Sequence, residues 1–223
     1  GKSEELFGQV LEKHPEYREK MIIQTKCAIV PGKRYDFSKE YIINAVNGSL
    51  KRLHTDHVEI LLLHRPDALC DPQEVAEAFD ELYVSGKVKY FGVSNHTPGQ
   101  IALLQKYTKH PIIINQLQLS IVHSVMIDSG MNMNMKEDFA IDKDGGVLDY
   151  CRLNDITIQA WSIVQASWAE GTFLNHPDYK KLNNILDDLA EKYNVAPAAI
   201  ATAWILSCLL YTSPSPRDGA TSR

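Results

Sequence analysis

The sequence predicts an α/β protein with a parallel sheet, because short runs of β-branched and leucine residues alternate with amphipathic helical stretches. Two of these runs, Ile60–Leu63 and Ile112–Ile114, are continuously apolar. Strands of this kind are buried on both faces, as they are in a parallel sheet covered by helices. The chain has 223 residues, enough for one or two domains with a substantial core.

Five strands are predicted from the apolar runs. Their ranges are Met21–Lys26, Val58–His64, Val88–Asn95, Ile112–Leu119 and Ile156–Ser162.

The helices between these strands carry their own start signals. Asp71 is a good N-cap acceptor, Pro72 suits the first helical position, and Glu74 stands where a capping box needs a carboxylate. Thr97 and Gln100 repeat this arrangement one unit later. The spacing therefore predicts helices that begin just after Asp71 and Thr97.

Apolar residues at helical spacing predict the core-facing sides of three helices. One stripe follows Ser38, a second ends before Gly86, and a third ends near Asn194. Their members are Ile42, Ile43, Val46, Leu50 and Leu53; Val75, Phe79 and Leu82; and Leu182, Ile185, Leu189 and Tyr193.

Two segments depart from this alternation. Residues 123–146 are rich in Met, Asn and Asp and are predicted to form a long loop, without the ligand spacing of a calcium site. Residues 208–223 switch to a Pro/Ser tract that resembles a translated sequencing adaptor and is expected to be a non-native or disordered tail. Residues 1–207 are expected to form the domain proper.

Composition excludes several classes of protein. With 44% hydrophobic and 23% charged residues, the chain has the composition of a globular protein. Its net charge of −5 and lack of a basic stripe argue against nucleic-acid binding. The apolar stretch 196–211 is too short to span a membrane. The four cysteines have no CxxC spacing, so no metal site is predicted and a reducing, cytoplasmic setting is expected.

Polar and aromatic side chains gather where the predicted strands end. The carboxyl ends of parallel strands meet at one edge of a sheet, which is where ligands bind in such folds. Each residue taken alone also has a structural explanation, such as a turn or a satisfied core histidine. The set comprises Lys26, His64, Ser94, Asn95, Gln116, Trp161 and Ser162.

The chemistry of this set suits a nicotinamide pocket. A partly buried lysine stabilises a neighbouring anion and can lower the pKa of a phenol. A neutral histidine can donate a hydrogen bond to a carbonyl oxygen on which charge develops. The hydroxyl and amide groups of Ser94, Asn95 and Gln116 can pair with a carboxamide, and Trp161 offers a flat face to an aromatic ring.

Several linked motifs resemble those of the aldo-keto reductases, and within that family those of the bacterial YdhF-like oxidoreductases. The resemblance runs from Gly1 to about Leu206 in the expected order and spacing. The motifs are Gln24-Thr-Lys26, the segment from Leu50 to Asp67 that contains Leu61-Leu-Leu-His64-Arg-Pro-Asp67, Phe91-Gly-Val-Ser-Asn95, and Asn115-Gln116.

The resemblance implies a (β/α)₈ TIM barrel that reduces an aldehyde or ketone to an alcohol with NADPH. It implies a tyrosine as proton donor, with Lys26 lowering its pKa and His64 orienting the carbonyl group. Ser94, Asn95 and Gln116 would hold the carboxamide, Trp161 would stack on the ring, and Ser162 would lie near the pyrophosphate. Ile163 departs from the family pattern, which usually has proline there.

On the same resemblance, the barrel is expected to be incomplete, with about strands three to seven present. The catalytic tyrosine and its partner aspartate would lie before Gly1, so this chain is expected to be inactive and poorly stable. Tyr17, Tyr35 and Tyr41 remain alternative proton donors, although none stands at the family position.

Two other function classes stay open. Gly1-Lys2-Ser3 before a helix is compatible with the end of a phosphate-binding P-loop, although a nucleotide hydrolase favours an aspartate where the strand ends in His64. A non-catalytic, cofactor-binding subunit of the same fold is the other alternative. The sequence does not predict an oligomeric state.

Overall fold

The computed structural model describes residues 1–131, 135–136, 141 and 143–209. The chain divides into two compact units, one formed by Gly1–Asn115 and one that begins at Gln116. Strand β6 crosses this boundary and is described with both units.

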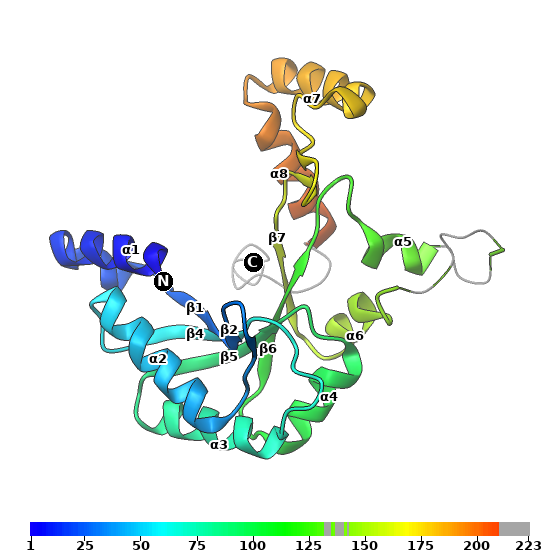
Figure 1. The fold of residues 1–223 in the computed structure, drawn as a ribbon. Helices are drawn as coiled ribbons and strands as arrows, with labels where there is room; N and C mark the ends of the chain where they lie inside the picture. Colours follow the sequence, from blue (N-terminus) through cyan, green and yellow to red (C-terminus); the bar gives the residue numbers. More distant parts are fainter. Residues whose placement is uncertain (132–134, 137–140, 142, 210–223) are drawn as a thin grey trace, which may run out of the picture. The chain divides into compact units, whose positions relative to one another are not determined.

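The first unit alternates strands and helices, as Figure 1 shows. Its elements are α1 (Lys2–Lys13), the 3₁₀ helix η1 (Pro15–Lys20), β1 (Gln24–Cys27), β2 (Ile29–Val30), β3 (Arg34–Tyr35), α2 (Lys39–Leu53), β4 (Val58–Leu63), α3 (Pro72–Val84), β5 (Val88–Ser94), α4 (Pro98–Tyr107) and the start of β6 (Ile112–Gln118).

The long strands of this unit lie in the order β1, β4, β5, β6. β1 is parallel to β4, with Lys26 opposite Leu62, and β4 is parallel to β5, with Leu63 opposite Val93. Parallel neighbours need helical connections, which α2 and α3 provide. The prediction of an α/β fold with parallel strands is therefore confirmed. The short β2 and β3 form a separate antiparallel pair that the sequence did not predict.

The predicted helix starts are confirmed. The side chains of Ser38, Asp71 and Thr97 each accept a hydrogen bond from a backbone N–H in the first turn of the helix that follows. Thr97 forms the expected capping box with Gln100. The expected role of Glu74 is wrong, because its carboxylate accepts a hydrogen bond from the backbone N–H of Lys39, at 2.9 Å, and so satisfies the first turn of α2 instead.

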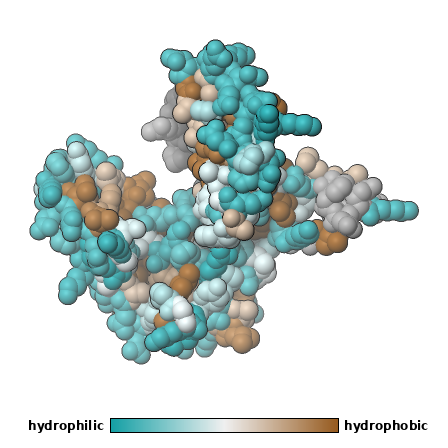
Figure 2. Space-filling model, turned by 45° about the horizontal axis from the view of Figure 1, so that its top comes forward, coloured by the Kyte–Doolittle hydropathy of each residue, from teal (hydrophilic) through white to brown (hydrophobic). Residues whose placement is uncertain are grey.

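The core of the first unit lies between β4, β5 and the helices. Phe79 of α3 and Phe91 of β5 are buried and stacked, with ring centroids 4.1 Å apart. Apolar side chains also reach the surface beside α1 (Figure 2), where Leu6, Val10 and Ile22 are exposed.

The second unit combines the end of β6 with helices and one hairpin. Its elements are α5 (Val125–Met131), α6 (Val147–Leu153), β7 (Thr157–Trp161), β8 (Gln165–Ser167), β9 (Gly171–Thr172), the 3₁₀ helix η3 (Pro177–Tyr179), α7 (Lys180–Tyr193) and α8 (Pro197–Leu209). β7 lies next to β6, and β8 pairs antiparallel with β9. The core contains Phe173 and Leu186. All five predicted long strands are thus present.

Two expectations for this unit are wrong. The predicted loop over residues 123–146 contains helix α5. Ser124, which directly precedes this helix, donates a hydrogen bond from its Oγ to Oδ2 of Asp128 in the first turn, 2.8 Å away. Residues 132–134, 137–140 and 142 of that loop lie outside the described residues. The predicted apolar stripe of α7 is also displaced, because Ile185 and Tyr193 are exposed, whereas Asn183, Leu186 and Ala190 are buried.

Asn183 explains the displaced stripe. Its amide nitrogen donates hydrogen bonds to the carbonyl oxygens of Phe173 and Tyr179, and its amide oxygen accepts one from the backbone N–H of Asn175. Three hydrogen bonds hold this polar side chain inward, and the face of α7 that carries it is the buried one.

No helix in the described part of the chain is long and apolar enough to cross a membrane. Helix α8 continues to Leu209. Residues 210–223, which make up most of the expected tail, lie outside the described residues, so the boundary at residue 207 stays a prediction.

Candidate active site

Lys26 and His64 lie at the carboxyl ends of two neighbouring parallel strands. Lys26 is in β1, and His64 directly follows β4. The backbone N–H of His64 donates to the carbonyl oxygen of Cys27, 3.0 Å away, and this bond ties the two strand ends together. Both side chains line one cavity of about 670 Å³ in the first unit.

The electrostatics of this cavity keep the imidazole of His64 neutral. Burial lowers the pKa of His64, and the positive charges of Lys26 and Arg65 lower it further. Burial and the charge of Arg65 also lower the pKa of Lys26. A neutral imidazole and a concentrated positive charge are therefore present at the same strand ends.

Tyr41 lines the same cavity. Its hydroxyl group donates to the carbonyl oxygen of Ile29, at 2.7 Å. Burial and the neighbouring Cys27 and Asp36 raise the pKa of the Tyr41 phenol. A phenol with a raised pKa, whose proton is already engaged, is a poor proton donor for a substrate.

Ser94 and Asn95 lie at the carboxyl end of the next strand, β5. Ser94 is buried, and its hydroxyl oxygen accepts a hydrogen bond from the Asn95 amide, 2.8 Å away. Asn95 has φ = 59°, in the left-handed region that asparagine tolerates better than most residues. The sharp turn at Asn95 sets hydroxyl and amide groups at the same edge of the sheet as Lys26 and His64.

His96 and Asn115 hold this turn, a role that the sequence reasoning missed. His96 is buried, and its Nδ1 donates to the carbonyl oxygen of Ser94, 3.0 Å away. Asn115 is fully buried, and its amide donates to the carbonyl oxygen of His96, 3.0 Å away. The signals that could have identified them are a histidine that closely follows the apolar strand β5 and an asparagine inside the apolar strand β6.

Gln116, Trp161 and Ser162 belong to the second unit. The Gln116 amide donates to Gln159 Oε1, 3.2 Å away, across β6 and β7. Trp161 ends β7, and its ring centroid lies 6.4 Å from that of Trp168 in the loop after β8. Ser162 has φ = 55° and accepts a hydrogen bond from the backbone N–H of Gln165, so a tight turn follows β7 although Ile163 replaces the expected proline.

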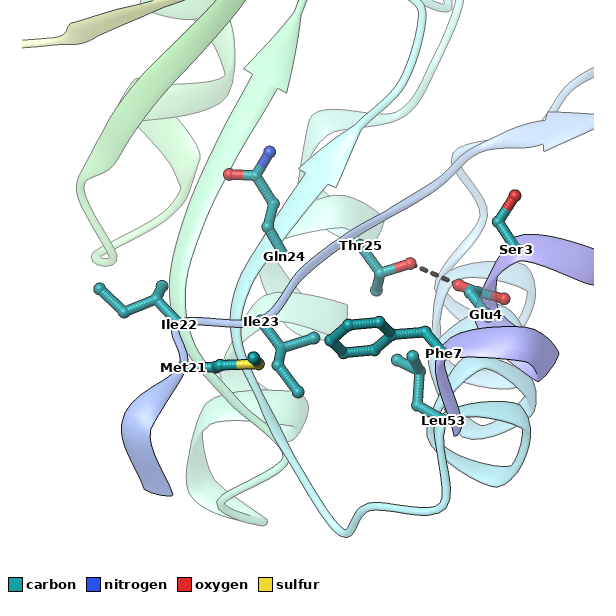
Figure 3. Close-up of a pocket in the computed structure, with 9 residues that line it drawn as sticks. All are labelled: Ser3, Glu4, Phe7, Met21, Ile22, Ile23, Gln24, Thr25 and Leu53. Carbon is teal, nitrogen blue, oxygen red and sulfur yellow. Dashed lines mark hydrogen bonds between the residues drawn. The ribbon is translucent and has the colours of Figure 1, made fainter. Parts of the chain in front are cut away.

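A second cavity in the first unit, of about 460 Å³, has a different character (Figure 3). It lies between α1 and β1, with Phe7, Ile23 and Leu53 among its walls. Thr25 donates a hydrogen bond to Glu4 at its edge. None of the predicted site residues lines it, and its lining contains no lysine, arginine or histidine. It therefore lacks the groups that bind phosphate or polarise a carbonyl.

Comparison with known proteins places this geometry in a family. The sequence model of the aldo/keto reductase family matches residues 1–217. Oxidoreductase YdhF of Escherichia coli is 35% identical over 225 residues, which cover 97% of this chain and 68% of that protein. A 6-dehydroglucose reductase of Novosphingobium aromaticivorans is 33% identical over 210 residues, covering 93% of this chain and 62% of that protein.

A solved structure has the same fold. The crystal structure of MGS-M4, an aldo-keto reductase enzyme from a Medee basin deep-sea metagenome library, has a TM-score of 0.65 at 25% identity, covering 92% of this chain and 64% of that one. The chain thus spans about two thirds of the length of each of these three relatives. Because the family model matches residues 1–217 and YdhF is 35% identical over 97% of the chain, the chain belongs to the aldo/keto reductase family.

Proposed function

We propose that the complete protein reduces the carbonyl group of an aldehyde or ketone to an alcohol with NADPH. The observation that carries the proposal is the placement of Lys26 and His64 in one cavity, at the carboxyl ends of adjacent parallel strands. A small-molecule carbonyl compound is the expected substrate, and the lack of a disulfide bond between cysteines of the described residues is compatible with a cytoplasmic location.

His64 donates a hydrogen bond to the carbonyl oxygen of the substrate. It can do so as a neutral imidazole because burial, Lys26 and Arg65 lower its pKa. Donation from a fixed group to an oxygen that gains negative charge stabilises the transition state more than the ground state.

Lys26 stabilises the phenolate of the tyrosine that the family resemblance assigns as proton donor. A phenol loses its proton more readily beside a positive charge, and each unit of pKa lowering corresponds to about 1.4 kcal/mol. Arg65 adds to the positive potential, because its charge lowers the pKa of both Lys26 and His64.

The polar groups at the strand ends fit a nicotinamide. The hydroxyl of Ser94 and the amide of Asn95 can pair with both ends of a carboxamide. For residues of the second unit, the family resemblance assigns a carboxamide contact to the Gln116 amide, stacking on the ring to the indole of Trp161 and a position near the pyrophosphate to Ser162. When bound, the nicotinamide supplies the hydride.

The test is NADPH oxidation by the protein expressed from the complete reading frame, with a panel of aromatic, aliphatic and sugar aldehydes. Lys26→Met should lower kcat by a factor on the order of 100 or more, because proton transfer is typically worth that much. Lys51→Met is the matched control, since Lys51 is exposed on α2.

Equal activity in both lysine variants would refute the proposed role of Lys26. Tight NADPH binding without turnover of any carbonyl compound would refute the reductase proposal and favour the cofactor-binding subunit. The absence of both binding and turnover would refute the proposed cofactor as well.

A further inference from the structure

A third cavity in the first unit has no part in the proposed reaction. Its volume is about 240 Å³, and it lies between the loop after β4, the first turns of α4 and Phe37. It shares no residue with the cavity that contains Lys26 and His64. Phe37, Leu103 and Leu104 are among its apolar walls.

His96 is the polar residue that defines the chemistry of this cavity. The residue is 3% exposed and lines the cavity. Its Nδ1 donates to the Ser94 carbonyl oxygen, so Nε2 carries the lone pair. Burial lowers the pKa of His96 to about 4, which keeps the ring neutral near pH 7.

No described residue supplies a hydrogen-bond donor to His96 Nε2. Its lone pair is therefore available to a molecule bound in the cavity. One water would occupy only about 30 Å³ and would leave the apolar walls without contacts. A ligand with both an apolar body and a hydrogen-bond donor can contact the apolar walls and also donate to His96 Nε2.

The remaining lining groups exclude an anion. The cavity is lined by the carboxylate of Asp67 and by no lysine or arginine. The Gln100 amide oxygen already accepts a hydrogen bond from the backbone N–H of Thr97, 2.9 Å away. A carbonyl compound is also a poor match for His96, because a carbonyl oxygen cannot donate to Nε2.

We propose that this cavity binds a small neutral aromatic alcohol, whose hydroxyl group donates to His96 Nε2 and whose ring packs against Phe37 and Leu104. The volume fits a single substituted ring, since a cavity of about 150 Å³ in another protein holds benzene. The site therefore binds an aromatic alcohol more tightly than a molecule of similar shape that has no hydrogen-bond donor.

Cys70 provides a local reporter, because it lines the cavity and is partly exposed. Cys27 and Cys151 are buried, so replacing Cys208 by serine leaves Cys70 as the one partly exposed thiol among the described residues. The experiment measures the rate at which a maleimide modifies Cys70 in the Cys208→Ser chain, with increasing 4-methylphenol or 4-methylanisole.

We expect 4-methylphenol to slow the modification at about one tenth of the concentration that 4-methylanisole requires, because one hydrogen bond distinguishes the two compounds. His96→Phe keeps an aromatic ring at this position and should bring the ratio of the two concentrations close to one. Failure of 4-methylphenol to protect Cys70, or an unchanged ratio in His96→Phe, would overturn the proposal.

A second pair of variants keeps the test decisive if His96→Phe does not fold. Leu103 is 45% exposed, so Leu103→Trp can fill the cavity from its rim and should abolish protection by both compounds. Leu153→Trp is the control, because Leu153 is 84% exposed in the second unit and should leave protection unchanged. Equal protection in both variants would place the ligand outside this cavity.

Discussion

Replacing Gly92 with alanine tests how closely the strands of the first unit pack. Gly92 lies in the middle of β5, and a Cβ there would stand 2.6 Å from Leu62 Cδ2, 2.8 Å from the carbonyl oxygen of Ile114 and 2.9 Å from Ile114 Cβ. The leucine methyl group can move, but the carbonyl oxygen belongs to the backbone of a neighbouring strand. The added methyl group must therefore displace a strand.

Overpacking of this kind lowers the free energy of unfolding by about 1 to 3 kcal/mol. Alanine also reduces the conformational entropy of the unfolded chain, which offsets about 0.4 to 1 kcal/mol of this effect. The expected net decrease in the free energy of unfolding is therefore about 1 to 2 kcal/mol. Urea denaturation followed by far-ultraviolet circular dichroism measures it.

Gly99→Ala is the matched control. Gly99 lies in the first turn of α4, and a Cβ there meets no atom within 4 Å. The control should be neutral or slightly stabilising, because alanine favours a helix by up to about 1 kcal/mol over glycine. If Gly92→Ala and Gly99→Ala have the same stability, the argument from close strand packing is wrong.

Three further predictions concern the first unit. Phe79→Ala should lower the free energy of unfolding by about 3 to 5 kcal/mol, because Phe79 is fully buried against Phe91; a urea midpoint near that of the parent chain would contradict this. Thr97→Ala removes the capping box with Gln100 and should reduce stability by about 1 kcal/mol in the same assay. The unfolded state binds a proton at His96 more readily than the folded state, whose pKa is about 4 against 6.5. Stability should therefore fall as the pH drops from 6.5 to 4, by up to about 3 kcal/mol, and His96→Phe should lose this part of the pH dependence in acid titrations of the denaturation midpoint.

The sequence predicts the strands and the helix starts well because their determinants are local. A continuous apolar run such as Ile60–Leu63 has few alternatives to a buried strand, and the capping side chains of Ser38, Asp71 and Thr97 act within three residues. The hydrogen bond of Glu74 is not local, because its partner, the backbone N–H of Lys39, is 35 positions away along the chain.

The two errors in the second unit have different causes, and the first of them is a set of tertiary hydrogen bonds. The face of α7 depends on Asn183, which contacts the backbone of Phe173 ten residues earlier. The prediction followed the spacing of apolar residues and therefore left Asn183 out of the buried face. Helix α5 lies in a segment of weak helix formers, and the pattern there contains no strong helical period.

For the candidate site, strand-end position was the informative signal. It identified Lys26, His64, Ser94 and Asn95, which the structure places at one edge of the first unit's sheet. It could not identify His96. The proposed role of this residue depends on the tautomer, in which Nδ1 donates to the Ser94 carbonyl oxygen and Nε2 has no donor partner from any residue that the structure describes.

The pair of indole rings at Trp161 and Trp168 has a practical consequence for spectroscopy. All three tryptophans of the chain, including Trp204, lie after residue 115, so the first unit is without this fluorophore. Emission from the indoles reports solely on the second unit, whereas circular dichroism records the helices of both. A single coincident transition by the two methods would mean that both halves lose structure cooperatively, and separated midpoints would give each half its own stability.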